Sequence, residues 1–127
     1  MIQAQARKRH PLVLVVDDDP EILEAICDIL DAEGYRVAQA RNGLEALDRV
    51  RAERPEVILL DLMMPVMDGQ AFARALRARG NGAIPIVVIS ADGNAHRATA
   101  LGARGFLSKP FDIDSLLFQV ATAAAHP

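Results

Sequence analysis

This chain is poor in cysteine and aromatic residues and has no long hydrophobic run. Its 127 residues include one cysteine, one tyrosine and no tryptophan. A single cysteine excludes an internal disulfide, and Cys27 falls on the apolar face of a predicted helix, so we expect a buried, inert thiol. The lack of eighteen consecutive apolar residues and of a signal-peptide pattern predicts no membrane association and a cytoplasmic protein.

Positive charge is scarce in most of the chain. The net charge is -3, but Arg7, Lys8 and Arg9 lie within the first ten residues. The rest of the chain therefore carries 11 basic and 17 acidic residues, a balance that argues against direct nucleic-acid binding. We expect residues 1–10 to be a flexible basic head and residues 11–127 to form one domain.

Hydrophobic residues make up 51% of the chain and alternate between strand and helix patterns. A chain of this length buries about two thirds of its unfolded surface, which suffices for one domain without staples. Five apolar runs, each followed by apolar residues at helical spacing, predict an α/β fold with a parallel sheet. The expected strands are Leu12–Val16, Tyr35–Ala40, Val57–Leu60, a segment after Pro85, and Gly105–Ser108.

Each helix is expected to turn one apolar face towards the sheet. Asp19 followed by Pro20 predicts a capped helix start, and Asp68 is expected to cap a later helix. The residues expected to face inward are Ile22, Ile26, Ile29 and Leu30 in the first helix, Leu44, Leu47 and Val50 in the second, Phe72 and Leu76 in the third, and Ile113, Leu117, Val120 and Ala124 in the last.

Acidic residues follow two of the predicted strands. Asp17 and Asp18 come directly after the first strand, and Asp61 comes directly after the third. Because ligands of open α/β sheets bind outside the carboxyl ends of the strands, these side chains predict an acidic pocket. Three carboxylates about 5 Å apart repel by roughly 3 kcal/mol per pair, and a magnesium ion would offset this. Taken alone, the same residues also fit solvated turns.

Two further polar side chains follow the last two strands. Ser90 ends the fourth strand and Lys109 follows the fifth, so both belong at the same edge of a parallel sheet. The chain has twelve arginines and two lysines, so a lysine here indicates that a compact point charge is needed. As an isolated residue, Lys109 also fits plain surface charge.

The order of these motifs resembles the receiver domain of two-component response regulators over residues 11–124. The resemblance is carried by Asp-Asp, Asp-x-x-Met-Pro-x-Met-Asp-Gly, Ser-Ala and Lys-Pro-Phe. It implies a flavodoxin-like, doubly wound (βα)5 fold with strand order 2-1-3-4-5. It also implies a signalling switch that accepts a phosphoryl group from a sensor histidine kinase or a histidine phosphotransfer protein and changes the binding of an unidentified downstream protein.

The resemblance assigns a role to each residue at the predicted edge. Asp61 is the expected phosphoacceptor, and Mg2+ is expected to bind Asp17, Asp18, Asp61 and the backbone carbonyl of Met63. The implied catalysis is limited to the protein's own phosphorylation and dephosphorylation. The remaining expected roles are Ser90 and Lys109 as phosphoryl contacts, Phe106 as the switching aromatic residue and Ala91 as the small residue that leaves the pocket open.

Two departures from the family pattern affect the expected output. About three residues are missing between Ser90 and Lys109, which predicts a shortened fourth helix near residues 95–101. Dimerisation through that helix is therefore not carried over. Phe106 also lacks the hydroxyl of the tyrosine that is frequent in the family, which removes one hydrogen bond from the switch.

Two other functions remain open from the sequence. One is a pseudo-receiver that binds its partner without phosphorylation, although all five motif residues are intact. The other is an aspartate-dependent phosphohydrolase, because Asp17-x-Asp19 is similar to the haloacid-dehalogenase motif; Glu21 stands where that motif needs a hydroxyl residue. The alanine-rich end at residues 121–125 finishes a helix without a linker, which favours a complete protein.

Overall fold

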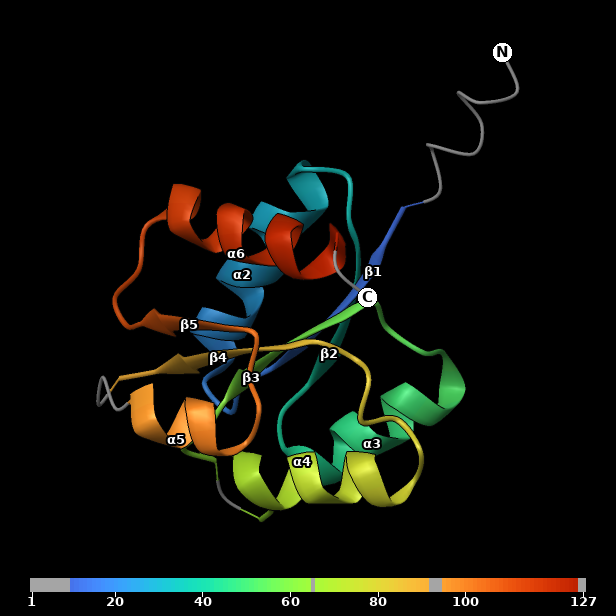
Figure 1. Ribbon diagram of the computed structural model, residues 1–127. Coiled ribbons are helices and arrows are strands. Elements are labelled where there is room, and N and C mark those ends of the chain that lie inside the picture. Colours follow the sequence, from blue (N-terminus) through green and yellow to red (C-terminus); the bar gives the residue numbers. More distant parts are fainter. Residues whose placement is uncertain (1–9, 65, 92–94, 126–127) are drawn as a thin grey trace.

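The computed structural model describes residues 10–64, 66–91 and 95–125, and within them the chain forms a five-stranded parallel sheet (Figure 1). The strands are β1 (Leu12–Val16), β2 (Arg36–Ala40), β3 (Val57–Asp61), β4 (Ile86–Ser90) and β5 (Gly105–Ser108). The helices are α2 (Pro20–Ala32), α3 (Gly43–Ala52), α4 (Gly69–Ala78), α5 (Ala95–Ala100) and α6 (Ile113–Ala125). The strand order is β2-β1-β3-β4-β5, which confirms the flavodoxin-like fold. The fourth helix, α5, has only six residues, so the predicted shortening is confirmed as well.

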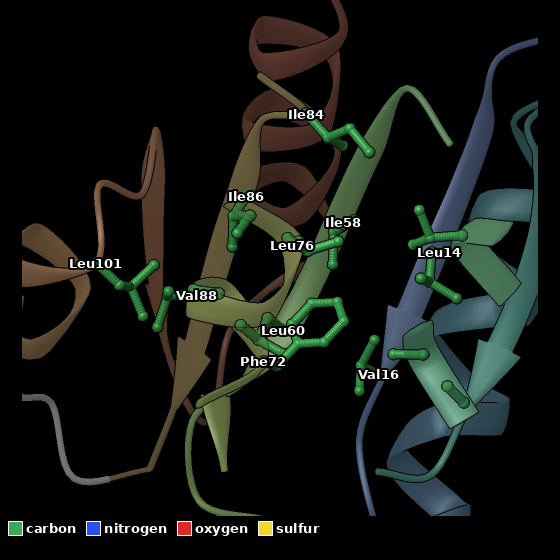
Figure 2. Close-up of a cluster of buried hydrophobic side chains, with 14 of the residues drawn as sticks. Leu14, Val16, Ile58, Leu60, Phe72, Leu76, Ile84, Ile86, Val88 and Leu101 are labelled. Atoms are coloured by element: carbon green, nitrogen blue, oxygen red, sulfur yellow. The ribbon is translucent and has the colours of Figure 1, made fainter. Parts of the chain in front are cut away.

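Helices cover both faces of the sheet, with α2 and α6 on one side and α3, α4 and α5 on the other (Figure 1). Because side chains alternate along a strand, β1 sends Val13 and Val15 towards α2, and Leu14 and Val16 towards α3. Each face of the sheet therefore has its own hydrophobic core. Figure 2 shows the core on the α3, α4 and α5 side, in which Phe72 of α4 is buried. All residues of β1, β3 and β4 are buried, as expected for strands covered on both faces.

Helix capping fixes the loops at the carboxyl edge of the sheet. The Asp19 carboxylate accepts hydrogen bonds from the first amides of α2, and Asp68 accepts one from Ala71 N at 2.8 Å, so both predicted caps are confirmed. A side chain at Gly69 would place its Cβ 2.6 Å from Leu62 Cδ2. Only glycine allows α4 to begin this close to the loop after β3.

Two of the predicted inward-facing residues are wrong. Leu44 is 52% exposed and Ile113 is 53% exposed. In α3 the buried residues are Gly43, Ala46, Leu47 and Val50, and in α6 the buried residues begin at Leu116. Both helices carry apolar residues on more than one side, so spacing alone does not fix which side meets the sheet.

The ends of two strands differ slightly from the prediction, and the boundary between the basic head and the domain is not tested. Strand β2 begins at Arg36, one residue later than predicted, and β3 extends to Asp61, one residue further. The predicted basic head lies outside the described residues except for His10, so the domain limits remain a prediction. Among the described residues, no helix is long and apolar enough to cross a membrane.

Candidate functional site

The register of the sheet brings the predicted site residues to one edge. Val16 pairs with Leu60, and Asp61 pairs with Ile89 in the next strand. Ser90 in turn pairs with Ser108, the residue before Lys109. Because all strands are parallel, the ends of β1, β3, β4 and β5 lie in a row. The three carboxylates predicted from the sequence therefore form a cluster at this edge, beside the amino end of α2, and this cluster with its surroundings is called the pocket below.

Lys109 is the basic group inside this pocket. Its Nζ lies 3.0 Å from Asp17 Oδ2 and 3.5 Å from Asp61 Oδ2. Asp17 is completely buried, and the Lys109 side chain is only 17% exposed. A charge pair that is withdrawn from water in this way is strongly coupled, so the reading of Lys109 as plain surface charge does not fit its position.

Burial and neighbouring charges shift the pKa values of both Asp61 and Lys109. Burial raises the pKa of Asp61 to about 6, and the charge of Asp17 adds to this. The amide of Met63, which donates to Asp61 Oδ1 at 3.1 Å, and the charge of Lys109 act in the opposite direction. For Lys109, burial alone lowers the pKa, but the close contact with Asp17 and the two carboxylate charges outweigh it and raise the pKa.

The three carboxylates suit a hard divalent cation. Asp17, Asp18 and Asp61 each present an oxygen within 4.8 Å of the others. The amide of Asp19 donates to Asp17 Oδ1, which turns Oδ2 into the pocket. Among the described groups, this buried oxygen has Lys109 as its ion-pair partner but accepts no hydrogen bond with regular geometry. Such an incompletely satisfied carboxylate oxygen is what a magnesium ion would use.

The remaining predicted residues surround this pocket. Ser90 is fully buried at the end of β4, and its carbonyl accepts a hydrogen bond from Lys109 N at 2.9 Å, which joins the two strand ends. Ala91 is exposed. Phe106 lies partly buried against the core on the α3, α4 and α5 side, in which Ala98 and Leu101 hold α5.

One contact near the site was missed by sequence reasoning. Arg97 of α5 places Nη1 3.2 Å from Met63 Sδ, in the loop after β3. Met63 is 54% exposed, so it does not fill a gap in the core as methionine often does. No motif marks this pair, because the two residues are 34 positions apart in the chain.

Comparison with known proteins finds a matching protein family and several related proteins. The family described as "Response regulator receiver domain" matches residues 13–121. The response regulator MprA of Mycobacterium avium (strain 104) is 42% identical over 108 residues, which are 83% of this chain and 47% of that protein. MprA of Mycobacterium tuberculosis (strain ATCC 25618 / H37Rv) matches at the same identity over 46% of its length. The chain thus spans about half the length of these curated relatives.

Solved structures agree with this match. The Francisella response regulator 1452 receiver domain has a TM-score of 0.82 at 33% identity, covering 91% of this chain and 98% of that chain. The chemotaxis response regulator CheY4 of Vibrio cholerae has a TM-score of 0.83 at 33% identity, covering 90% of this chain and 98% of that one. The similarity therefore extends over 90% to 91% of this chain.

Proposed function

This chain belongs to the family of response regulator receiver domains of two-component systems, and from that premise we propose that it is a phosphorylation-dependent switch whose phosphoacceptor is Asp61. The observation that carries the proposal is the shared Lys109 ammonium, 3.0 Å from Asp17 and 3.5 Å from Asp61. The donor is proposed to be a sensor histidine kinase or a histidine phosphotransfer protein, and phosphorylation is proposed to change the binding of a downstream protein.

The proposed reaction is a phosphoryl transfer between two side chains. A carboxylate oxygen of Asp61 forms a bond to phosphorus, while the bond from phosphorus to the donor's imidazole nitrogen breaks and its electron pair stays on that nitrogen. Such transfers need positioning and charge stabilisation more than a protein base. The Met63 amide orients Asp61 from one side, and Lys109 supplies positive charge from the other.

The carboxylates of Asp17, Asp18 and Asp61 are proposed to hold Mg2+, together with the carbonyl of Met63. When bound, the ion supplies positive charge next to the transferring phosphoryl oxygens. Asp17 is preorganised for this role, because the Asp19 amide holds one of its oxygens and leaves the other turned into the pocket. The Asp18 side chain is exposed and is therefore able to adjust to the ion.

Ser90 and Lys109 are proposed to carry the response. A phosphoryl group on Asp61 adds acceptor oxygens at the ends of β4 and β5, and the hydroxyl of Ser90 and the ammonium of Lys109 are the groups suited to bind them. Phe106 of β5 packs on the same core as α5, so a movement at the ends of β4 and β5 would reach this helix. Phosphorylation would thus favour a second arrangement of this side of the sheet.

The test is labelling with a small phosphodonor, acetyl phosphate, in the presence and absence of Mg2+. We expect acid-labile, Mg2+-dependent incorporation into the wild type and none into Asp61→Asn. Asp28→Asn, which removes the same charge from an exposed position of α2, should be labelled like the wild type. Phosphate appearing in the Asp61→Asn variant on another residue would refute the assignment.

A further inference from the structure

The charged residues of this domain are divided between different parts of its surface. Residues 17–33, which include α2, contain eight acidic residues and no basic one. Residues 69–91, which include α4, contain three arginines and no acidic residue. These arginines, Arg74, Arg77 and Arg79, are all exposed. Although the domain as a whole is acidic, the surface of α4 is therefore locally basic.

A hollow of about 200 Å³ lies between α3 and α4, which pack side by side (Figure 1). Buried apolar side chains form its floor, and exposed arginines stand on its rim. It is smaller than the roughly 300 Å³ at which small-molecule sites begin, so it suits one apolar side chain of a partner better than a whole ligand. The lining residues are Leu47, Val50 and Arg51 of α3, Leu76 of α4, and Arg79 and Asn81 after α4.

Positive charge exceeds negative charge around this hollow. Arg51 pairs with Asp48 at 2.8 Å, but both side chains are highly exposed, so the pair is weak and easily exchanged. Arg79 has no ion-pair partner within the part of the chain that the structure describes. A third guanidinium, that of Arg54, donates to the amide oxygen of Asn81 at 2.7 Å. This neutral acceptor holds the Arg54 charge beside the hollow without cancelling it.

The hollow lies near the edge of the sheet that is opposite the proposed phosphoacceptor. Helix α3 joins β2 to β3 and α4 joins β3 to β4, so both run from the carboxyl edge of the parallel sheet back to its amino edge. A ten-residue helix is roughly 15 Å long, which separates Arg51 and Arg79, at the far ends of these helices, from Asp61. A partner that is bound at the hollow therefore leaves Asp61 accessible.

We propose that this hollow is a docking site for an acidic segment of a partner protein, which inserts one large apolar side chain and places its carboxylates against Arg51 and Arg79. An apolar anchor in a small pocket with a charged rim is a common arrangement of protein interfaces, and arginine pairs well with carboxylates. The apolar floor and the acidic balance of the domain disfavour a nucleic acid as the occupant. Docking here uses neither Asp61 nor Lys109, so the inference goes beyond the proposed function and does not depend on it.

The experiment titrates the isotope-labelled protein with synthetic peptides and follows the backbone amide resonances by NMR. The first peptide carries a single leucine between glutamates, the second has alanine in place of that leucine, and the third has lysines in place of the glutamates. We expect the first peptide to shift resonances mainly at residues 47–54 and 76–81. The second should bind roughly tenfold more weakly, as for the loss of one buried apolar side chain, and the third should not bind. Equal binding of the first two peptides, or shifts outside these residues, would overturn the inference.

Matched variants separate the rim of the hollow from general surface charge. Arg79→Gln should bind the first peptide roughly threefold to fivefold more weakly than the wild type, as for the loss of one exposed ion pair. Arg74→Gln removes the same charge from an exposed position of α4 that does not line the hollow, and should bind like the wild type. Asp61→Asn should also bind like the wild type, because docking does not use the phosphoacceptor. Equal affinities of Arg79→Gln and Arg74→Gln would overturn the inference.

Two other occupants are tested in the same set of proteins. A single-stranded oligothymidylate that binds more tightly than the first peptide, and less tightly to Arg79→Gln, would assign the hollow to a nucleic acid. Self-association of the wild type in sedimentation, lost in Arg79→Gln, would assign it to the acidic helix α2 of a second copy. Either result would overturn the proposal of a foreign acidic partner, and we expect neither.

Discussion

Lys109 lies closer to Asp17 than to Asp61, with Nζ 3.0 Å from the first carboxylate and 3.5 Å from the second. The ammonium is therefore shared between a proposed metal ligand and the proposed phosphoacceptor. Phosphorylation would change this balance, because phosphoryl oxygens on Asp61 compete with Asp17 for the same cation. Lys109 would thus couple the phosphorylation of Asp61, at the end of β3, to the end of β5.

The first prediction concerns the shape of this cation. Lys109→Arg should still permit phosphorylation, because positive charge remains, but should weaken its consequences, since a wide planar guanidinium does not fit the place of a compact ammonium. Amide exchange across residues 90–108 should change less on phosphorylation in the variant than in the wild type. Lys8→Arg, the same substitution at the other lysine of the chain, is the matched control. Equal exchange responses in all three proteins would show that the compact shape of the Lys109 ammonium has no part in the response to phosphorylation.

The second prediction concerns the pH dependence of stability in metal-free protein. The pKa of Asp61 is raised from 3.8 to about 6, chiefly by burial, so the folded protein binds this proton more tightly than the unfolded chain. The stabilisation from Asp61 is therefore fully present below about pH 4 and is lost as the pH rises towards 6. At pH 7, Asp61→Asn should raise the free energy of unfolding by about 1 to 3 kcal/mol.

Urea unfolding with a chelator at pH 4.5 and pH 7 checks this prediction. The advantage of Asp61→Asn should be largest at pH 7 and should shrink at the lower pH, where the wild-type carboxyl is protonated. Asp28→Asn controls for the loss of one negative charge on the surface. An Asp61→Asn variant that is less stable than the wild type at pH 7 would show that the ionised carboxylate is well compensated in the folded protein.

The third prediction concerns magnesium. If Mg2+ binds only the folded state, it should stabilise the wild type by about 1 to 3 kcal/mol at concentrations well above its dissociation constant. Asp17→Asn should lose most of this stabilisation, because Asp17 is the fully buried carboxylate of the cluster. Thermal unfolding with and without Mg2+ measures the difference, with Asp28→Asn as the control. A shift of the midpoint that persists in Asp17→Asn would place the ion elsewhere.

The sequence predicted the sheet and the acidic edge well because the relevant residues follow the apolar runs directly. Asp17 and Asp61 each come at the end of a run of buried residues, and a parallel sheet necessarily aligns these ends. The strand order itself came from the family resemblance, since apolar periodicity does not state which strands are neighbours. The register of β4 and β5 then completes the site with Ser90 and Lys109.

Features that depend on tertiary packing were not predictable in the same way. The inward face of α6 begins at Leu116 instead of Ile113, because apolar residues lie on several sides of this helix. Val66 has a φ of 71°, a left-handed conformation that β-branched residues rarely adopt, so no propensity would select it. The contact of Arg97 with Met63 depends on how α5 docks, which local sequence does not determine.

The last prediction concerns the surface that signals the phosphorylated state. Helix α5 has six residues and is held mainly by packing, because a helix this short is marginal by itself. Beryllofluoride with Mg2+ should therefore change amide protection most across residues 92–106, and the downstream partner should bind over this region and α6. Phe106 has no hydroxyl for the switch, so we expect modest coupling of about 1 to 3 kcal/mol, or roughly 5- to 150-fold in partner affinity. Asp61→Asn should show neither effect. Protection changes confined to α2 and α3, with residues 92–106 unaffected, would place the output on another face of the protein and contradict this account of the switch.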